Sequence, residues 1–208
     1  MHIRKQVETM KKGQKIETAE VRSEPLKNQY QIDQVRGMLE KYTREPLRNK
    51  IIFNIGINNG IRTGDIVKLK IKDVYNKDYA RIRESKTGKT RDIRLNVAGI
   101  KQDIIDYVGK KPVDDNTYLF TSHKNPREPI STTAVYRIFK RLNEVSGGQY
   151  PHLTAHSMRR TFGYMYYKQT HDIATLMKLF NHSSQAITMR YIGMDREELR
   201  NNLKNFEL

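Results

Sequence analysis

Three short segments of the chain combine arginine, histidine or tyrosine with small polar residues, a pattern suited to phosphate chemistry. In the first segment, Arg62 lies where a turn meets a predicted helix, and Asp65 follows it. The carboxylate could orient the guanidinium there, and the amides at the helix start could help to bind an anion. A helix-capping aspartate paired with a surface arginine would explain the same residues without any chemistry.

The second segment begins with Thr154, a residue type that caps helix N-termini well. His156 and Arg159 are three residues apart in the helix that should follow, so they project from one face of its first turn. An imidazole and a guanidinium at the positive end of a helix suit a phosphate. The alternative is a basic helix start that rests on a DNA backbone or faces solvent.

The third segment contains His182 and runs to Tyr191. Small polar residues around His182 predict that one helix stops there and another begins, with Tyr191 near the end of the new helix. A tyrosine in such a position usually packs in a core or on a surface. Its value as a nucleophile therefore depends on the residues that accompany it.

Side chains from separate predicted elements together form a set that suits cleavage of a phosphodiester without a metal. The members of this set are Arg62, Lys86, His156, Arg159, His182 and Tyr191. Two arginines can bind the non-bridging oxygens with forked donors and stabilise the charge that builds on them. A histidine can accept the nucleophile's proton or donate to an oxygen, and a lysine can protonate the leaving 5′-oxygen. A deprotonated phenol can attack phosphorus and form a covalent phosphotyrosine, from which a second hydroxyl reseals the strand.

Two other patterns are poor candidates for chemistry. Gly88-Lys89-Thr90 resembles the end of a nucleotide-binding P-loop, but Arg83 stands where that loop requires glycine. His152 and His156 have a spacing that a metal site on one helix could use, yet Thr154 predicts that the helix begins between them. We therefore expect no metal and no cofactor.

The composition predicts a polyanionic partner. Among 208 residues, 39 lysines and arginines outnumber 23 acidic residues, which gives a formal net charge of +16. The absence of cysteine excludes disulfides and thiolate nucleophiles and suits a reducing compartment. No apolar run is long enough to span a membrane, and the polar start argues against a secretory signal. We expect a cytoplasmic protein that acts on nucleic acid, although a merely well-solvated or ribosome-associated basic protein would have a similar composition.

Apolar spacing predicts an α+β fold that is mainly α-helical, with a small antiparallel three-stranded sheet. Alternating residues over 79–83 and 91–95, joined by a polar loop, predict a β-hairpin, and the apolar run 118–120 is expected to add a third strand. Helical spacing predicts helices near 32–42, 46–58, 65–69, 96–108, 131–145, 154–168, 172–180, 184–191 and 195–205. Residues 1–28 have no apolar period and are expected to form a flexible polar arm.

In their order and spacing, the candidate segments resemble the tyrosine recombinase, or phage integrase, family. Residues 59–65 are similar to the family's G-[LM]-R-x-x-E segment, and residues 85–89 to its β-hairpin lysine loop. Residues 156–163 are similar to its H-x-L-R-x-T-x-[AG] box, and residues 180–191 to L-G-H-S-S-x-x-x-T-x-x-Y. The resemblance extends from about Gln31 to the C-terminus and covers all the candidate positions.

The resemblance implies a role for each residue that contacts the phosphate. Arg62 and Arg159 would bind the scissile phosphate. His156 would assist proton transfer and phosphate binding, and His182 would bond a non-bridging oxygen.

The remaining roles follow from the same resemblance. Lys86 would be the general acid, and Tyr191 would be the nucleophile that becomes joined to the 3′-phosphate. Asp65 would be a supporting residue, at a position where the family more often has Glu. Asn181 replaces a common glycine and could shift the His182 loop slightly. The stretch 195–208 could dock on a neighbouring protomer or pack against its own domain.

The implied fold is the tyrosine recombinase catalytic core over residues 29–208, preceded by the arm of residues 1–28. The implied protein is a site-specific DNA recombinase or integrase that cleaves and rejoins double-stranded DNA, as a tetramer on DNA in the nucleoid. Family members usually carry a separate DNA-binding domain in front, so we expect either a catalytic-domain fragment or a short standalone member. A DNA-binding regulator without recombination activity and a type IB topoisomerase-like nickase are the alternatives.

Overall fold

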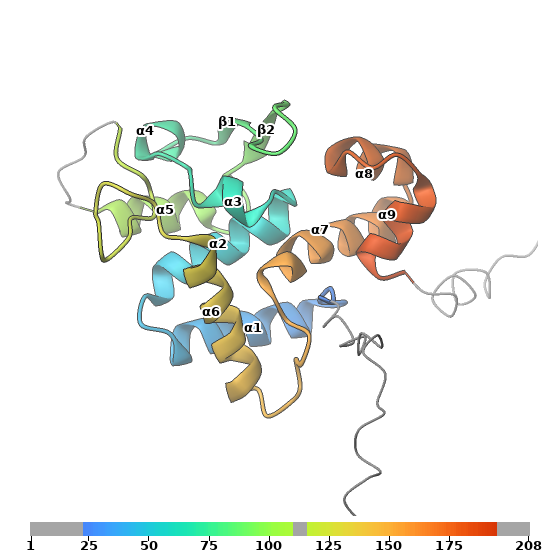
Figure 1. Ribbon diagram of the computed structural model, residues 1–208, viewed down its shortest axis with the longest axis horizontal. Helices are drawn as coiled ribbons and strands as arrows, with labels where there is room; N and C mark the ends of the chain where they lie inside the picture. The colour runs from blue at the N-terminus through green and yellow to red at the C-terminus, as the bar shows by residue number, and fades with distance from the viewer. Residues whose placement is uncertain (1–22, 110–115, 195–208) are drawn as a thin grey trace, which may run out of the picture.

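The computed structural model describes residues 23–109 and 116–194, in which helices predominate (Figure 1). The helices are α1 (Gln29–Tyr42), α2 (Pro46–Asn59), α3 (Thr63–Ile66), α4 (Ile71–Val74), α5 (Ile100–Val108), α6 (Thr132–Val145), α7 (Ala155–Thr170), α8 (Ile173–Phe180) and α9 (Gln185–Ile192). The strands β1 (Tyr79–Arg83) and β2 (Thr90–Arg94) lie between α4 and α5 in the chain. The prediction of a mainly helical fold with a small antiparallel sheet is confirmed.

The ends of the first two helices follow local signals in the sequence. The side chain of Asn28 accepts a backbone hydrogen bond and caps α1, and Pro46 occupies the first turn of α2. Helix α2 stops at Gly60, whose φ of 60° lies in the left-handed region. A Cβ at this position would also collide with the ring of Phe162, so both the backbone and the packing require glycine.

Strands β1 and β2 pair antiparallel, with Ala80 opposite Ile93, and both of these side chains are buried. The predicted third strand over 118–120 is wrong. Tyr118 forms an isolated bridge with Lys70, and the sheet within the described residues has two strands. The apolar run serves the core instead, because Phe120 is fully buried.

Buried apolar side chains form two clusters of unequal size. The larger cluster, here called the main core, extends from Leu26 to Met158 and joins the hairpin, α1 to α6 and the start of α7. The smaller cluster consists of Tyr164, Leu176, Phe180 and Ile192. It stabilises the C-terminal lobe, which we define as the second half of α7 with α8 and α9. Figure 1 shows α8 and α9 on one side of the molecule, joined to the rest through α7.

The predicted flexible arm is too long at its C-terminal end. Leu26 is buried, and its backbone N–H donates a hydrogen bond of 2.9 Å to the hydroxyl of Thr161 on α7. The hydroxyl of Ser23 bonds that of Thr154, which caps the same helix. Residues 23–28 are therefore packed on α7, and the rest of the predicted arm lies outside the described residues.

Other element boundaries also differ from the sequence prediction. Helix α5 begins at Ile100, after the left-handed Gly99, rather than near residue 96. The helix predicted over 65–69 is replaced by the single turns α3 and α4. The helix predicted over 195–205 lies outside the described residues. None of the helices within 23–109 and 116–194 has the length and apolar character needed to cross a bilayer.

Candidate active site

A cavity of about 530 Å³ opens where α3, the hairpin loop and the first turn of α7 meet. Arg62, Lys86 and His156 line it, together with Asp65. Arg62 is the residue that precedes α3, Lys86 lies in the loop between β1 and β2, and His156 lies in the first turn of α7. The fold thus brings half of the predicted site residues to one cavity from three distant segments.

A buried carboxylate holds Arg62. Its Nη1 donates to Oε2 of Glu84 at 2.7 Å, and Glu84 is only 4% exposed. Glu84 also accepts a hydrogen bond from Thr87 and lies 3.6 Å from Arg91. Burial raises the pKa of Glu84, but the hydrogen bonds from Thr87 and Arg62 outweigh burial and hold this pKa below its ordinary value. The carboxylate therefore stays charged and fixes one edge of the Arg62 guanidinium, whose other donors remain for an anion.

Asp65 holds the lysine loop, whereas the sequence left open whether it orients Arg62 or caps a helix. Its Oδ1 accepts the backbone N–H of Ser85 at 2.8 Å, and the Asp65 side chain is buried. Lys86 follows Ser85 directly and is exposed at the cavity. The guanidinium is oriented by Glu84 instead, so Asp65 supports the site by fixing the backbone that carries Lys86.

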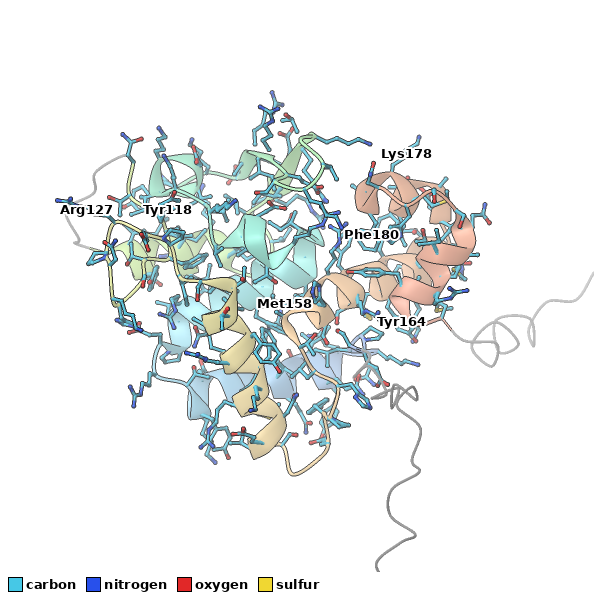
Figure 2. The ribbon with its side chains drawn as sticks, viewed as in Figure 1. Tyr118, Arg127, Met158, Tyr164, Lys178 and Phe180 are labelled. Carbon is cyan, nitrogen blue, oxygen red and sulfur yellow. The ribbon has the colours of Figure 1, made fainter. Side chains whose placement is uncertain are left out.

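Arg159 lies between the main core and the C-terminal lobe and is 4% exposed. One guanidinium nitrogen donates to the carbonyl of Gly60 at the end of α2, and another donates to the carbonyl of Phe180 at 3.3 Å. Its Cζ lies 4.3 Å from the centroid of the Phe180 ring, and Figure 2 shows Phe180 at the junction of α8 with α7. Burial lowers the pKa of Arg159 to about 10, so this arginine is still a cation at neutral pH.

His182 and Tyr191 meet within the C-terminal lobe. Their ring centroids are 5.1 Å apart at an angle of 76°, and both rings contact the edge or face of Phe180. Tyr191 is half-buried, and Cζ of Arg160 lies 5.0 Å from the centroid of its ring. Burial raises the pKa of Tyr191, while the charges of Arg159 and Arg160 oppose this rise. The phenol therefore lies in the field of two guanidinium groups.

Hydrogen bonds within the lobe fix the orientation of His182. Its Nδ1 lies 3.1 Å from the hydroxyl oxygen of the buried Thr188, and that hydroxyl donates to the carbonyl of Ser184 at 3.2 Å. With the hydroxyl donating to Ser184, its oxygen is an acceptor for Nδ1–H, and Nε2 is the ring nitrogen outside this pair. Burial lowers the pKa of His182, and the charges of Arg159 and Arg62 lower it further.

His156 stands on the cavity side of α7. Thr154 caps the helix through a hydrogen bond of 3.1 Å to the backbone of His156, as the sequence predicts. The residue is exposed overall, yet partial burial lowers the pKa of His156, and Arg160 and Arg159 lower it further. Its ring is therefore a neutral base in the ordinary pH range, beside the cavity that Arg62 lines.

Arg62 connects the two groups of predicted residues. The first group is the cavity set Arg62, Lys86 and His156, and the second is the lobe set Arg159, His182 and Tyr191. Arg159 of the lobe set donates to the carbonyl of Gly60, two residues before Arg62, so the two groups adjoin. An anion between them would meet two guanidinium groups, a phenol and imidazole nitrogens.

Sequence reasoning missed three residues of the site's supporting structure. Glu84 continues the inward alternation of Ala80 and Ile82, so strand periodicity could have identified it as a buried carboxylate. Lys89, just before β2, and Arg91 on β2 hold the end of α8. Lys89 Nζ donates to Asn181 Oδ1 at 2.5 Å, and Arg91 Nη1 donates to the Leu179 carbonyl at 3.5 Å.

The structure describes both of the patterns that the sequence marked as poor candidates, residues 88–90 and the pair His152 and His156. Gly88-Lys89-Thr90 lies in the turn and return strand of the hairpin, without the strand-then-helix context of a P-loop. His152 precedes α7 and His156 lies within it. Across the parts of the chain that the structure describes, no three histidine or acidic side chains group as ligands for a metal ion.

Comparison with known proteins shows the family to which this chain belongs. The sequence profile of the phage integrase family matches residues 28–198. The probable integrase/recombinase YoeC of Bacillus subtilis is 39% identical over 88% of this chain and 96% of its own length. The tyrosine recombinase XerA of Pyrococcus furiosus is 26% identical over 81% of this chain. This chain spans 58% of that recombinase, and 43% of the 32% identical XerC of Caldanaerobacter subterraneus.

Solved structures give the same fold. A XerH site-specific recombinase bound to a palindromic difH substrate, in a post-cleavage complex, has a TM-score of 0.70 at 20% identity and covers 87% of this chain. The match covers 52% of the XerH chain. A XerA recombinase has a TM-score of 0.66 at 22% identity, over 89% of this chain and 67% of its own. At this level of identity the likeness concerns the fold.

Proposed function

The chain belongs to the phage integrase family of tyrosine recombinases, and from that membership we propose that it cleaves and rejoins double-stranded DNA through a covalent phosphotyrosine at Tyr191. The observation that carries this proposal is the position of the Tyr191 ring, whose centroid lies 5.1 Å from that of His182 and 5.0 Å from Cζ of Arg160, with the charge of Arg159 also acting on the phenol. Two guanidinium groups beside a phenol favour its phenolate form, which a tyrosine that only packs in a core does not use.

The proposed cleavage is an in-line displacement at phosphorus. The Tyr191 oxygen bonds to the phosphorus as the bond to the 5′-oxygen breaks, and the strand remains attached to the enzyme by its 3′-phosphate. His156 accepts the phenol proton, and Lys86 donates a proton to the leaving 5′-oxygen. Attack by a 5′-hydroxyl then reverses these steps, so a strand is resealed without an external energy source.

Arg62 and Arg159 are proposed to bind the non-bridging oxygens. Their charge stabilises the transition state and also favours the phenolate, because Arg159 already opposes the rise in the pKa of Tyr191. His182 would donate to a non-bridging oxygen from Nε2. A bound phosphate favours the imidazolium that this bond requires, since a nearby negative charge raises a histidine pKa.

The partner is proposed to be duplex DNA. A formal net charge of +16 supports a polyanionic ligand, and the XerH structure is a complex with its difH substrate. We further propose that the active form is a homo-tetramer on DNA and that the protein associates with the nucleoid. The catalytic domain would then occupy residues 29–208, with residues 23–28 packed against it.

The proposal is tested with a nicked suicide substrate, from which the short cleaved strand diffuses away. Incubation in EDTA should give a covalent protein–DNA adduct, and Tyr191→Phe should abolish it while duplex binding persists. Tyr166→Phe on α7 is the matched control and should leave the adduct intact. An adduct with Tyr191→Phe would refute the nucleophile, and binding without any adduct from the unaltered chain would refute the activity.

A further inference from the structure

Arg160 on α7 lies against the ring of the proposed nucleophile. Its Cζ is 5.0 Å from the centroid of the Tyr191 ring, within the range of a cation–π contact. The preceding Arg159 makes the corresponding contact with Phe180, whose ring meets that of Tyr191 edge-on at 5.3 Å. The family's H-x-L-R-x-T-x-[AG] box prescribes Arg159 but leaves position 160 open, and Arg160 is outside the set of six candidate residues.

The packing of α7 on α9 holds this contact in place. A Cβ on Gly163 would lie 2.6 Å from Ile192, so the two helices approach closely at that point. Arg160 precedes Gly163 by about one helical turn, and Tyr191 precedes Ile192 by one residue. Ile192 is fully buried, and Arg160 and Tyr191 are partly buried. The same interface that buries Ile192 therefore presses the guanidinium onto the tyrosine ring.

Arg160 is also a neighbour of His156, the proposed base. The two residues are four apart in α7, a spacing that places side chains together on one face of a helix. Burial lowers the pKa of His156, and the charge of Arg160 lowers it further. Arg160 therefore borders both groups of the proposed proton transfer, the phenol of Tyr191 and the imidazole of His156.

The two contacts have opposite effects on that proton transfer, and the contact with Tyr191 should be the stronger one. A cation favours the phenolate that forms on Tyr191 but disfavours the imidazolium that forms on His156. Tyr191 is half-buried under the guanidinium, whereas His156 is exposed, where solvent screens the charge more strongly. The charged and titratable groups that act on the Tyr191 phenol or touch its ring include Arg159, Arg160, Arg62 and His182.

We propose that Arg160 is a positioning residue for the nucleophile, whose guanidinium holds the Tyr191 ring at the α7–α9 interface and keeps a cation beside the phenol during attack on phosphorus. This inference rests on the proposed function, since it takes Tyr191 to be the nucleophile. Arg160 acts through the tyrosine only: it exchanges no proton and forms no bond with the scissile phosphate. A neutral side chain of similar length would keep part of the packing and lose the cation.

Single-turnover cleavage of the suicide substrate at saturating DNA tests this role. Arg160→Gln should slow adduct formation at neutral pH by about 2–30-fold, as expected for the loss of a partly buried cation–π contact. Arg160→Lys should recover most of the rate, because an ammonium group also binds the face of a ring. Arg190→Gln is the matched control, since it removes an exposed arginine beside Tyr191 in α9, and it should leave the rate unchanged.

The pH dependence distinguishes a positioned cation from a merely loosened helix. Loss of a cation favours the protonated forms of Tyr191 and His156, so the rising limb of the pH–rate profile should move to higher pH in Arg160→Gln. The limb should stay in place in Arg190→Gln. A substrate with sulfur as the bridging 5′-atom needs no general acid, because a thiolate leaves unprotonated. This substrate should rescue Lys86→Met but not Arg160→Gln.

A second measurement does not depend on turnover. With fluorotyrosine in place of tyrosine, the fluorine NMR signal that is lost in Tyr191→Phe reports the pKa of the Tyr191 phenol in the free protein. This pKa should be higher in Arg160→Gln than in Arg190→Gln, because only the first variant removes a cation from the ring.

Each outcome decides one question. Equal cleavage rates and equal phenol pKa values in Arg160→Gln and Arg190→Gln would overturn the proposal. Slower cleavage by Arg160→Gln with an unshifted pH profile would reduce Arg160 to a packing role and would also overturn it. If the unaltered chain forms no adduct while the pKa of Tyr191 rises only in Arg160→Gln, the proposed function fails and the placement of the Arg160 cation on the phenol stands.

Discussion

The main core and the C-terminal lobe hold the candidate site from opposite sides, and they differ in how they are stabilised. The main core buries apolar side chains from α1 to α6, the hairpin and the start of α7, and it carries Arg62 and the lysine loop. Within the described residues the lobe buries four apolar side chains, and it carries His182 and Tyr191. Local opening is easier where fewer apolar contacts are buried. We therefore expect the half that carries Arg62 to be the more rigid one, and the half that carries Tyr191 to open more easily.

The lobe is nevertheless closely fitted where it joins the main core. A Cβ on Gly163 of α7 would lie 2.6 Å from Ile192 and 2.7 Å from the Phe180 ring, so glycine lets α8 and α9 approach α7. Polar contacts from Arg159, Arg91 and Lys89 then hold the end of α8. A small hydrophobic cluster and a few polar contacts replace the extensive burial found in the main core.

Substitution of one fully buried leucine in each half allows a direct comparison. Leu39 lies in the main core and Leu176 in the lobe. Leu39→Ala should lower the free energy of unfolding by about 2–5 kcal/mol, while the folded variant cleaves at its usual rate. Leu176→Ala should slow cleavage, because it loosens the segment that presents Tyr191. Denaturant unfolding and adduct formation on the suicide substrate measure the two effects. Equal slowing of cleavage by both variants would contradict the division into halves.

Arg159 joins the halves, and its removal should affect both chemistry and packing. Arg159→Ala should slow adduct formation at saturating DNA by about 10²–10³-fold, because a donor to the developing charge is lost. It should also destabilise the fold, since the Gly60 and Phe180 carbonyls lose their partner. Single-turnover cleavage and thermal unfolding measure these effects. A loss of duplex affinity as large as the loss of rate would indicate a role in binding alone.

The lobe should respond to acid through His182. Its pKa is lowered in the folded protein, so the unfolded chain binds the proton more readily. The resulting stability is present above about pH 6.5 and is lost as the pH falls through the folded value. His182→Asn should therefore lose less stability than the unaltered chain on acidification from neutral pH. Denaturant midpoints across this range measure the difference, and parallel losses would exclude His182 as the cause.

The smallest effect is expected at the surface contact between Lys89 and Asn181. Asn181→Gly keeps the left-handed backbone, where φ is 55°, and removes the side-chain acceptor. Together with Lys89→Met it forms a double-mutant cycle, whose coupling in the cleavage rate should stay below about 1 kcal/mol, the upper end for exposed ion pairs, because only one partner is charged. Additive effects would mean that the hairpin and the lobe are not coupled at this point.

Local signals were sufficient to predict most elements of the fold. Pro46 and Gly60 mark both ends of α2, and alternation around a polar loop identifies the hairpin. The failures are short segments whose state depends on distant partners. The run 118–120 has the composition of a strand but pairs at a single bridge, and the one turn of α4 is too brief to have a periodicity.

The candidate site was predictable as a set of residues, but its internal partners were not. Order and spacing nominated the six residues, since each has a distinctive local pattern, and their catalytic roles stay a prediction. Asp65 and Glu84 are both carboxylates near Arg62 in the fold, and their assignment depends on how α3 meets the hairpin. Asn181 departs from the family pattern, and only its contact with Lys89 gives that departure a physical meaning.

The Phe180 ring limits which amino-acid substitutions the candidate site can accept. Phe180 lies beneath the guanidinium of Arg159 and touches the rings of both His182 and Tyr191. The Phe180 ring therefore fixes the positions of Arg159, His182 and Tyr191 relative to one another, so a change at one of these contacts affects the other two. A substitution of Phe180, in evolution or in design, would therefore require compensating changes around Arg159, His182 and Tyr191 together.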